Sequence, residues 1–246
     1  MDSRELIKRR NIHMIIFLGT VILCFFSMIL IAIFVQNENI KTIVNICILG
    51  IILFFCLGYR GTLFYYNTSA KVAKMIINQG PPIEFSNNIY TNPSFFTESN
   101  YEKVKTDSFE IYYLYEKINT PFLKKIRSLD IHILIKSPDT SFYSDDLTTQ
   151  IHKIEESVSK RERASKVNIT IYKKYEILLK KDLEEISEVI CLNLSLKYYT
   201  QINVGLFENK LYFLYSKNYF PSIYYKNGVE KIIKMFKTKN SSIYRK

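Results

Sequence analysis

The sequence has no tryptophan and is poor in glycine, histidine and cysteine. Its 246 residues include 7 glycines, 3 histidines and 4 cysteines. So few glycines leave little from which the chain could build a phosphate-binding loop, and it contains no Walker, G-x-G-x-x-G or G-x-S-x-G motif. Nucleotide-cofactor enzymes and α/β-hydrolases are therefore disfavoured, and we expect no cofactor.

The few histidines and cysteines are also badly spaced for a metal site. His13, His132 and His152 form no His-x-x-x-His pair, and the sequence has no C-x-x-C pair. Three of the four cysteines fall within long apolar runs. We therefore expect neither a zinc site nor a disulfide.

Charged residues are missing from two N-terminal runs, residues 14–35 and 43–59. The first has 22 residues, with Thr20 and Ser27 as its polar exceptions, and the second has 17. At about 1.5 Å per residue, a helix of the first length crosses a hydrocarbon core of about 30 Å. A cleaved signal peptide is a poorer interpretation, because its apolar region has only about 7–15 residues before a small-residue cleavage site. The runs predict two transmembrane helices joined by a short external loop, residues 36–42.

Lysine and arginine residues predict which way the two spans run. Four basic residues precede the first span, at Arg4, Lys8, Arg9 and Arg10, whereas the loop has only Lys41. Basic residues follow the second span from Arg60 onward. Because short basic segments stay on the cytoplasmic side, we expect both termini inside a two-pass plasma-membrane protein. The residues expected at the inner interface are Arg9, Arg10, Tyr59, Arg60, Tyr65 and Tyr66. No ionisable residue lies within either span, which disfavours a transporter.

The whole chain has a formal net charge of +11, and most of that excess follows the spans. Residues 60–246 contain 29 lysines and arginines against 20 acidic residues, a net charge of +9. A basic domain tethered beside an anionic inner leaflet is attracted to it, so the membrane itself is the first expected partner. Nucleic acid is a second possibility, but no nucleic-acid-binding motif accompanies the charge. Abundant isoleucine, lysine and asparagine also indicate a low-GC bacterial genome.

Outside the two spans we expect a basic cytoplasmic N-terminus at residues 1–13, a juxtamembrane helix and linker at 60–100, a cytoplasmic α+β domain at 101–237 and a basic tail at 238–246. Gly80-Pro81-Pro82 should end the helix that continues from the second span. Within the domain we expect a mixed or antiparallel sheet with three or four helices.

Periodicity locates the elements of this domain. Residues 109–118, 130–137 and 167–179 are rich in β-branched and aromatic residues and predict strands. Apolar residues at helical spacing predict helices over 147–158 and 228–237. Residues 202–215 predict a β-hairpin with Leu206 opposite Leu211 around Glu208-Asn209, although a longer loop is an alternative, because glutamate is a poor residue for positive φ.

A further helix is expected after Asp182. Asp182 and Glu185 have the spacing of a capping box, and apolar residues from Leu183 to Tyr199 recur on two sides of a helix. A helix that is apolar on two sides should be central to the core.

One group of residues could carry chemistry. Asp130, His132 and Lys136 alternate along one strand face, and Glu110 lies on the preceding strand. Two carboxylates and a lysine on neighbouring strands resemble the layout of metal-dependent nucleases, so Glu110, Asp130 and Lys136 are candidate catalytic residues. The acid-x-lysine spacing of such enzymes is absent from the sequence. A strand that exposes one polar face is the commoner explanation for these alternating polar residues.

Two hypotheses of function follow. The first is a non-catalytic, membrane-tethered cytoplasmic module that binds another protein, as conflict, immunity, conjugation and signalling accessories with this layout do. The second is a membrane-anchored nucleic-acid-binding protein or nuclease-like enzyme.

Overall fold

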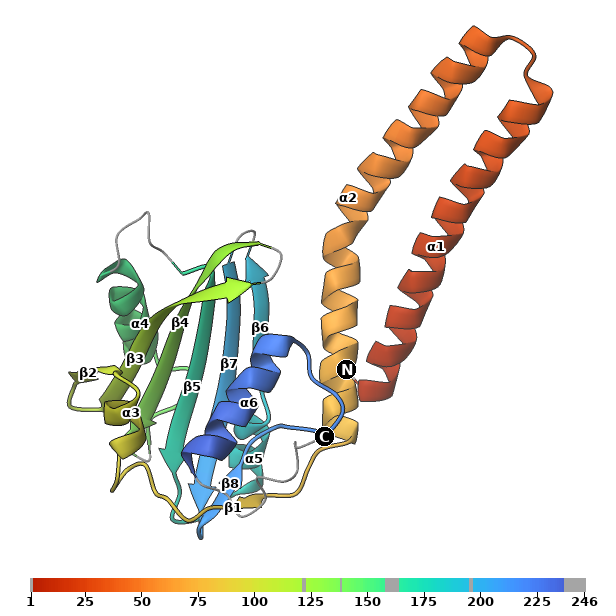
Figure 1. The fold of residues 1–246 in the computed structure, drawn as a ribbon. Helices are drawn as coiled ribbons and strands as arrows, with labels where there is room; N and C mark the ends of the chain where they lie inside the picture. The colour runs from red at the N-terminus through yellow and green to blue at the C-terminus, as the bar shows by residue number, and fades with distance from the viewer. Residues whose placement is uncertain (1, 121–122, 138, 158–163, 195–196, 237–246) are drawn as a thin grey trace. The chain divides into compact units, whose positions relative to one another are not determined.

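A computed structural model describes residues 2–120, 123–137, 139–157, 164–194 and 197–236 of the chain (Figure 1). The chain divides into two compact units, Met1–Ile77 and Asn78–Lys246. The predicted basic tail, residues 238–246, lies outside the described residues.

The first unit is a hairpin of two long helices, α1 (Ser3–Phe34) and α2 (Glu38–Ile77). The Asp2 side chain accepts a hydrogen bond from the backbone of Arg4 and caps α1. The Asn37 side-chain oxygen, Oδ1, accepts hydrogen bonds from the backbone N–H groups of Asn39 at 3.0 Å and Ile40 at 3.2 Å, and so caps the start of α2. At the other end of α1 the Val35 N–H bonds to the Ile31 carbonyl, and a three-residue connection leads from there to the capped start of α2.

The most apolar stretch of each hairpin helix is unburied, and both helices are long and apolar enough to cross a membrane. The hydroxyl groups of Thr20 and Ser27 each donate to a carbonyl one helical turn earlier, at 2.9 Å. These internal bonds remove the two hydroxyl donors from the apolar surface.

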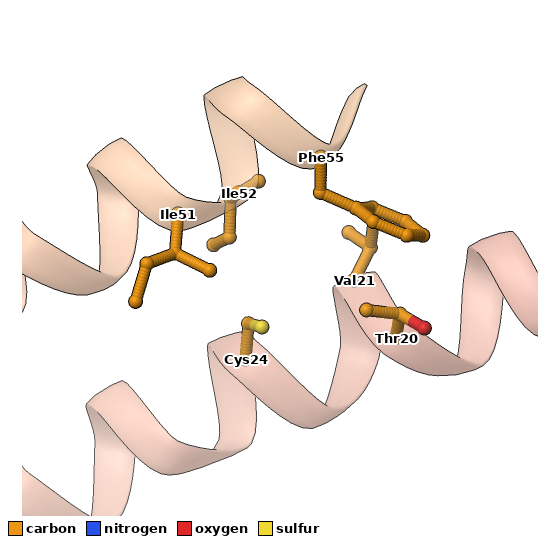
Figure 2. Close-up of a pocket in the computed structure, with 6 residues that line it drawn as sticks. All are labelled: Thr20, Val21, Cys24, Ile51, Ile52 and Phe55. Carbon is orange, nitrogen blue, oxygen red and sulfur yellow. The ribbon is translucent and has the colours of Figure 1, made fainter. Parts of the chain in front are cut away.

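The facing sides of the hairpin helices are not completely filled. A cavity of about 70 Å³ lies between them. Figure 2 shows its lining residues, which are Thr20, Val21 and Cys24 from α1 and Ile51, Ile52 and Phe55 from α2. Nearer the start of α1 the same interface closes through stacked rings, because the Phe17 ring of α1 lies 5.9 Å from the Phe55 ring and 6.0 Å from the Tyr59 ring of α2.

The second unit begins at Asn78, earlier than the sequence predicts. α2 ends at Ile77, just before Gly80-Pro81-Pro82, as expected. The residues that follow are not a linker, because Ile83, Ile89 and Phe96 are fully buried. Ile83 belongs to β1 (Ile83–Glu84), which pairs with β8 (Lys210–Tyr212), the last strand in chain order. Residues 78–100 therefore belong to the same compact unit as the strands that follow them.

The second unit is built on a mixed eight-stranded sheet. Its other strands are β2 (Glu102–Lys105), β3 (Phe109–Thr120), β4 (Leu123–Ile135), β5 (Lys166–Lys174), β6 (Val189–Leu194), β7 (Lys197–Phe207) and β8 (Lys210–Tyr212). The order is β1-β8-β7-β5-β4-β3-β2, and β6 also pairs with β7. β4, β5 and β7 are parallel, while every other pair is antiparallel. Of the two sheet types that the sequence allows, mixed or antiparallel, the structure shows the mixed one.

Helices cover both faces of this sheet: α3 (Ser94–Glu98), α4 (Asp145–Ser157), α5 (Lys180–Ile186) and α6 (Ile223–Met235) (Figure 1). Ile131, Ile133 and Ile135 of β4 share one core with the apolar residues of α4 and with Ile186 of α5. Side chains alternate along β4, so Asp130, His132 and Leu134 face the opposite side. There Phe96 of α3 stacks on Tyr112, with centroids 4.0 Å apart, and α6 covers β5 and β7.

The helix expected from Asp182 to Tyr199 is wrong beyond Ile186. α5 ends there, and Val189–Leu194 forms β6, antiparallel to the start of β7. A run that is apolar on two sides suits a strand as well as a helix, and pairing with β7 decides between them. Asp182 is also not the cap itself: it is the third residue of the helix, and its carboxylate accepts the Leu179 N–H at 2.9 Å.

The predicted hairpin is confirmed around its turn, but it is shorter than expected because β8 ends at Tyr212. Leu206 pairs with Leu211, and Glu208 and Asn209 form a two-residue turn with φ angles of 48° and 60°. Two successive positive φ angles match the right-handed twist of the strands, so the shorter loop forms although glutamate is unfavourable in it.

Candidate functional site

Asp130 and His132 lie on the inner face of β4, at the centre of the sheet. Asp130 is 7% exposed and His132 is 1% exposed. The strand spacing puts both side chains on one face, and His132 Nε2 lies 3.1 Å from Asp130 Oδ2. A buried carboxylate needs compensating donors, and the rest of the site supplies them.

Two residues from distant parts of the chain complete the cluster around this carboxylate. Tyr101 follows α3, and the positive φ of Asn100, 57°, turns the chain so that the Tyr101 N–H bonds back to Phe96. The Tyr101 hydroxyl donates to Asp130. Lys231 of α6 donates to Asp130 Oδ2 at 2.5 Å and to the Tyr101 oxygen at 3.0 Å. A helix, a loop and a central strand therefore meet at one carboxylate.

The network continues to the neighbouring strand. His132 Nδ1 lies 2.9 Å from the Tyr172 hydroxyl of β5, and Tyr172 is fully buried. The two rings are also stacked, with centroids 5.9 Å apart. Both ring nitrogens of His132 thus have partners within the protein.

The electrostatics of the cluster favour an ionised Asp130. Burial alone would raise the pKa of Asp130, but His132 and Lys231 outweigh it and hold that pKa well below its ordinary range. Burial, reinforced by the nearby Asp130 charge, raises the pKa of Tyr101 and of Tyr172 well above that of a free tyrosine. Both phenols therefore stay protonated at neutral pH and act as donors. Chemically, the cluster is a compensated ion pair within a closed hydrogen-bond network.

The structure does not bring Glu110, Asp130 and Lys136 together. Glu110 forms an ion pair with Lys103 and accepts a hydrogen bond from Tyr112 at 2.9 Å. Asp130 pairs in register with Leu114, so Glu110 lies four residues away along β3, at about 13 Å.

Lys136 lies beyond the end of β4 and bonds to the carbonyl oxygen of Thr106. Its position is six residues, or about 20 Å, from Asp130 along the chain. Each of the three candidates therefore has separate partners.

The residues expected at the membrane interface lie in the first unit. Tyr59 and Tyr66 of α2 both contact His13 of α1: the Tyr59 hydroxyl is 2.5 Å from His13 Nδ1, and the Tyr66 ring is stacked on the imidazole at 4.2 Å. Arg9 forms an ion pair with Glu5 at 2.7 Å.

The other interface candidates have fewer cross-helix contacts. Arg10 donates to the neighbouring Asn11, at 2.6 Å for the closer nitrogen. Arg60 and Tyr65 are exposed, and Tyr65 is also in edge contact with Tyr66. Through their contacts with His13, Tyr59 and Tyr66 help to hold the two helices of the hairpin together.

Sequence reasoning found Asp130 but missed Tyr101, Tyr172 and Lys231. Tyr101 and Lys231 are 29 and 101 residues from Asp130 in the chain, and neither lies in a motif. The one available signal was the spacing of Asp130 and His132, which places an acid and an imidazole on one strand face.

Within the part of the chain that the structure describes, no three His, Cys, Asp or Glu side chains form a group that could hold a metal ion. No protein-family model, curated protein or solved structure matches the chain.

Proposed function

We propose that this protein is a two-pass membrane-tethered module of a low-GC bacterium that acts by binding a protein partner rather than by catalysis. In this proposal α1 and α2 span the plasma membrane, and both termini and the sheet domain lie in the cytoplasm. A conflict, immunity, conjugation or signalling accessory would have this layout.

The closed network around Asp130 is the observation that supports a binding role most directly. The Asp130 carboxylate accepts hydrogen bonds from Lys231 and Tyr101, and both nitrogens of His132 are engaged. A general acid or base must offer a proton position to its substrate. Here the acid and the imidazole join α6 and the Tyr101 loop to the sheet, which is a structural role.

The charge distribution supports the membrane tether and its orientation. Four basic residues precede the apolar part of α1, whereas Lys41, in the first turn of α2, forms an ion pair with Glu38 at 2.8 Å. The positive-inside rule places such an asymmetric pair of spans with the basic ends in the cytoplasm. The net charge of +9 after the spans then lies beside an anionic leaflet, which attracts it.

A metal-dependent nuclease-like enzyme is the alternative, and the basic excess is the observation in its favour. The positions of Glu110, Asp130 and Lys136 weigh against it, because two-metal sites need carboxylates within a few ångströms of the same ions.

The full-length chain, purified from membranes in mild detergent, tests the two proposals together. We expect another protein to co-purify at a fixed ratio, and we expect no cleavage of DNA or RNA when Mg²⁺ or Mn²⁺ is added. Metal-dependent cleavage that is abolished by Asp130→Asn but retained in Lys226→Met, a change at an exposed α6 position, would establish the alternative.

A further inference from the structure

Lys166, the first residue of β5, is a buried lysine that the Asp130 network does not use. It is 7% exposed, and within the described chain its ammonium forms neither an ion pair nor a hydrogen bond. Its charge instead faces an aromatic ring, because Lys166 Nζ lies 3.8 Å from the ring centroid of Tyr224. A ring face compensates for part of the charge but gives the three N–H donors no lone-pair acceptor. Burying such a charge is costly unless an anion accompanies it.

A second buried donor lies beside Lys166. The register of β4 and β5 pairs Ser128 directly with Lys166, so both side chains lie on the sheet face that α6 covers. Ser128 is 4% exposed, and its hydroxyl has no hydrogen-bond partner in the part of the chain that the structure describes. An ammonium and a hydroxyl, both without an acceptor, are therefore neighbours on two adjacent strands.

The start of α6 completes this group. Tyr224, which lies on the Lys166 ammonium, is the second residue of α6, and Ser222 caps the helix by accepting the Tyr225 N–H at 3.1 Å. The first turn of α6 has no acidic residue. Backbone N–H groups in the first turn of a helix have no intrahelical partner and carry a partial positive charge. The buried ammonium therefore lies against a helix end that also favours an anion.

Neighbouring carboxylates do not neutralise this group. Asp130 follows Ser128 on the same face of β4, but it is paired with Lys231 at 2.5 Å. Glu116 is exposed and lies opposite Ser128 on β3, which places it two strands, or about 10 Å, from Lys166. Among the described residues, no carboxylate forms an ion pair with Lys166. The group therefore has an excess of positive charge.

We propose that Lys166, Ser128 and the first turn of α6 bind the phosphate group of a ligand. A lysine ammonium and the N–H groups at a helix N-terminus are common phosphate donors, whereas arginine suits the two oxygens of a carboxylate. The partly exposed rings of Tyr198 and Tyr224, with centroids 5.6 Å apart, border the site, so the rest of the ligand meets an aromatic surface. Soluble phosphorylated molecules and phospholipid headgroups both present this group. The inference does not depend on the membrane tether.

Binding of inorganic phosphate to the full-length chain in mild detergent tests the proposal. Isothermal titration in chloride of constant ionic strength should detect one saturable site per chain. Lys166→Met should weaken phosphate binding at least about tenfold, because it removes a charge-assisted hydrogen bond. The matched control is Lys174→Met, at an exposed position of the same strand, and it should leave the affinity unchanged.

Thermal unfolding shows whether Lys166 has a structural role instead. Without phosphate, Lys166→Met should melt no lower than the parent chain, because methionine removes a buried charge and retains the apolar stem. At a phosphate concentration ten times the dissociation constant, the melting temperature of the parent chain should rise by about 3 °C. That of Lys174→Met should rise equally, and that of Lys166→Met should rise less.

Equal phosphate affinity of the parent chain and Lys166→Met, or no saturable binding by the parent chain, would overturn the proposal. Equal weakening by Lys174→Met would show an effect of net charge alone and would also overturn it. Competition separates the two sources of phosphate. Displacement by adenosine monophosphate would support a soluble ligand, and displacement only by phosphatidic acid in the micelles would support a lipid headgroup. Displacement by neither would contradict a ligand larger than phosphate itself.

Discussion

Lys231 Nζ lies 2.5 Å from Asp130 Oδ2, and this contact joins the last helix of the sheet domain to its central strand. The two residues are 101 positions apart in the chain. The Lys231 side chain is 32% exposed while that of Asp130 is 11% exposed, so the pair lies at the margin of the core. Removing either partner leaves an incompletely compensated charge, which costs more than the pair contributes when intact.

We therefore expect Asp130→Asn to lower the free energy of unfolding by about 2 kcal/mol. Lys231→Met should cost less, about 1 kcal/mol, because the lysine is partly solvated and Tyr101 and His132 still contact the carboxylate. Urea unfolding of the full-length chain in detergent, followed by circular dichroism, measures both changes.

Lys226→Met is the control on the same helix. Lys226 is 3.7 Å from Glu230 and both side chains are more than 40% exposed, so its loss should change stability by less than about 0.5 kcal/mol. Equal effects of Lys226→Met and Lys231→Met would mean that the Asp130 network does not hold α6.

The same carboxylate predicts a pH dependence. The pKa of Asp130 in the folded chain is below its ordinary value of 3.8, so the folded state favours the ionised form. The stability this provides is present in full above that value and is lost as the pH falls below it.

The stability gap between the parent chain and Asp130→Asn should therefore narrow on acidification, with a slope of at most about 1.4 kcal/mol per pH unit for one group. Urea unfolding at a series of pH values between about 5 and 2 measures it. A gap that stays constant over this range would show that the charge of Asp130 does not contribute to stability.

Gly80 predicts a steric effect at the entry to the sheet domain. Its N–H donates to the Tyr215 carbonyl at 2.9 Å, and the Tyr215 hydroxyl donates to the Pro81 carbonyl at 2.6 Å. A Cβ atom on Gly80 would lie 2.2 Å from a ring carbon of Tyr215, whose side chain is buried and is held by its hydrogen bond to Pro81. Gly80→Ala should therefore cost about 1–3 kcal/mol of stability.

Gly61→Ala provides the comparison. Gly61 lies within α2, with nothing within 4 Å of the added carbon, so alanine should be neutral or favourable there. Thermal unfolding of the two variants in the same detergent separates the effects, and equal melting temperatures would rule out the close contact at Tyr215.

The sequence predicts local features of this chain well because they depend on neighbours in the chain. Two uncharged apolar runs, each long enough for a spanning helix, identify the helical hairpin. Strict alternation of apolar and polar residues identifies Ile131, Ile133 and Ile135 as one buried strand face. The turn at Glu208-Asn209 follows from the pairing of Leu206 with Leu211.

What the sequence does not predict depends on contacts between distant segments. Val189–Leu194 forms a strand because it pairs with β7. The pattern of its apolar residues does not predict that pairing. β1 and β2 are too short to have a readable period, and α3 has only five residues. Tyr101 and Lys231 contact Asp130 only because segments 29 and 101 residues away from it in the chain pack on the same face of the sheet.

Membrane topology tests the central claim most directly, because the tether and the cytoplasmic position of the sheet domain both depend on it. The measurement is labelling of intact cells with a membrane-impermeant thiol reagent, comparing Asn39→Cys in the first turn of α2 with Lys226→Cys on α6. We predict labelling above the parent chain at Asn39→Cys in intact cells, and at Lys226→Cys only after the cells are made permeable. Labelling of Lys226→Cys in intact cells would place the sheet domain outside and contradict the account.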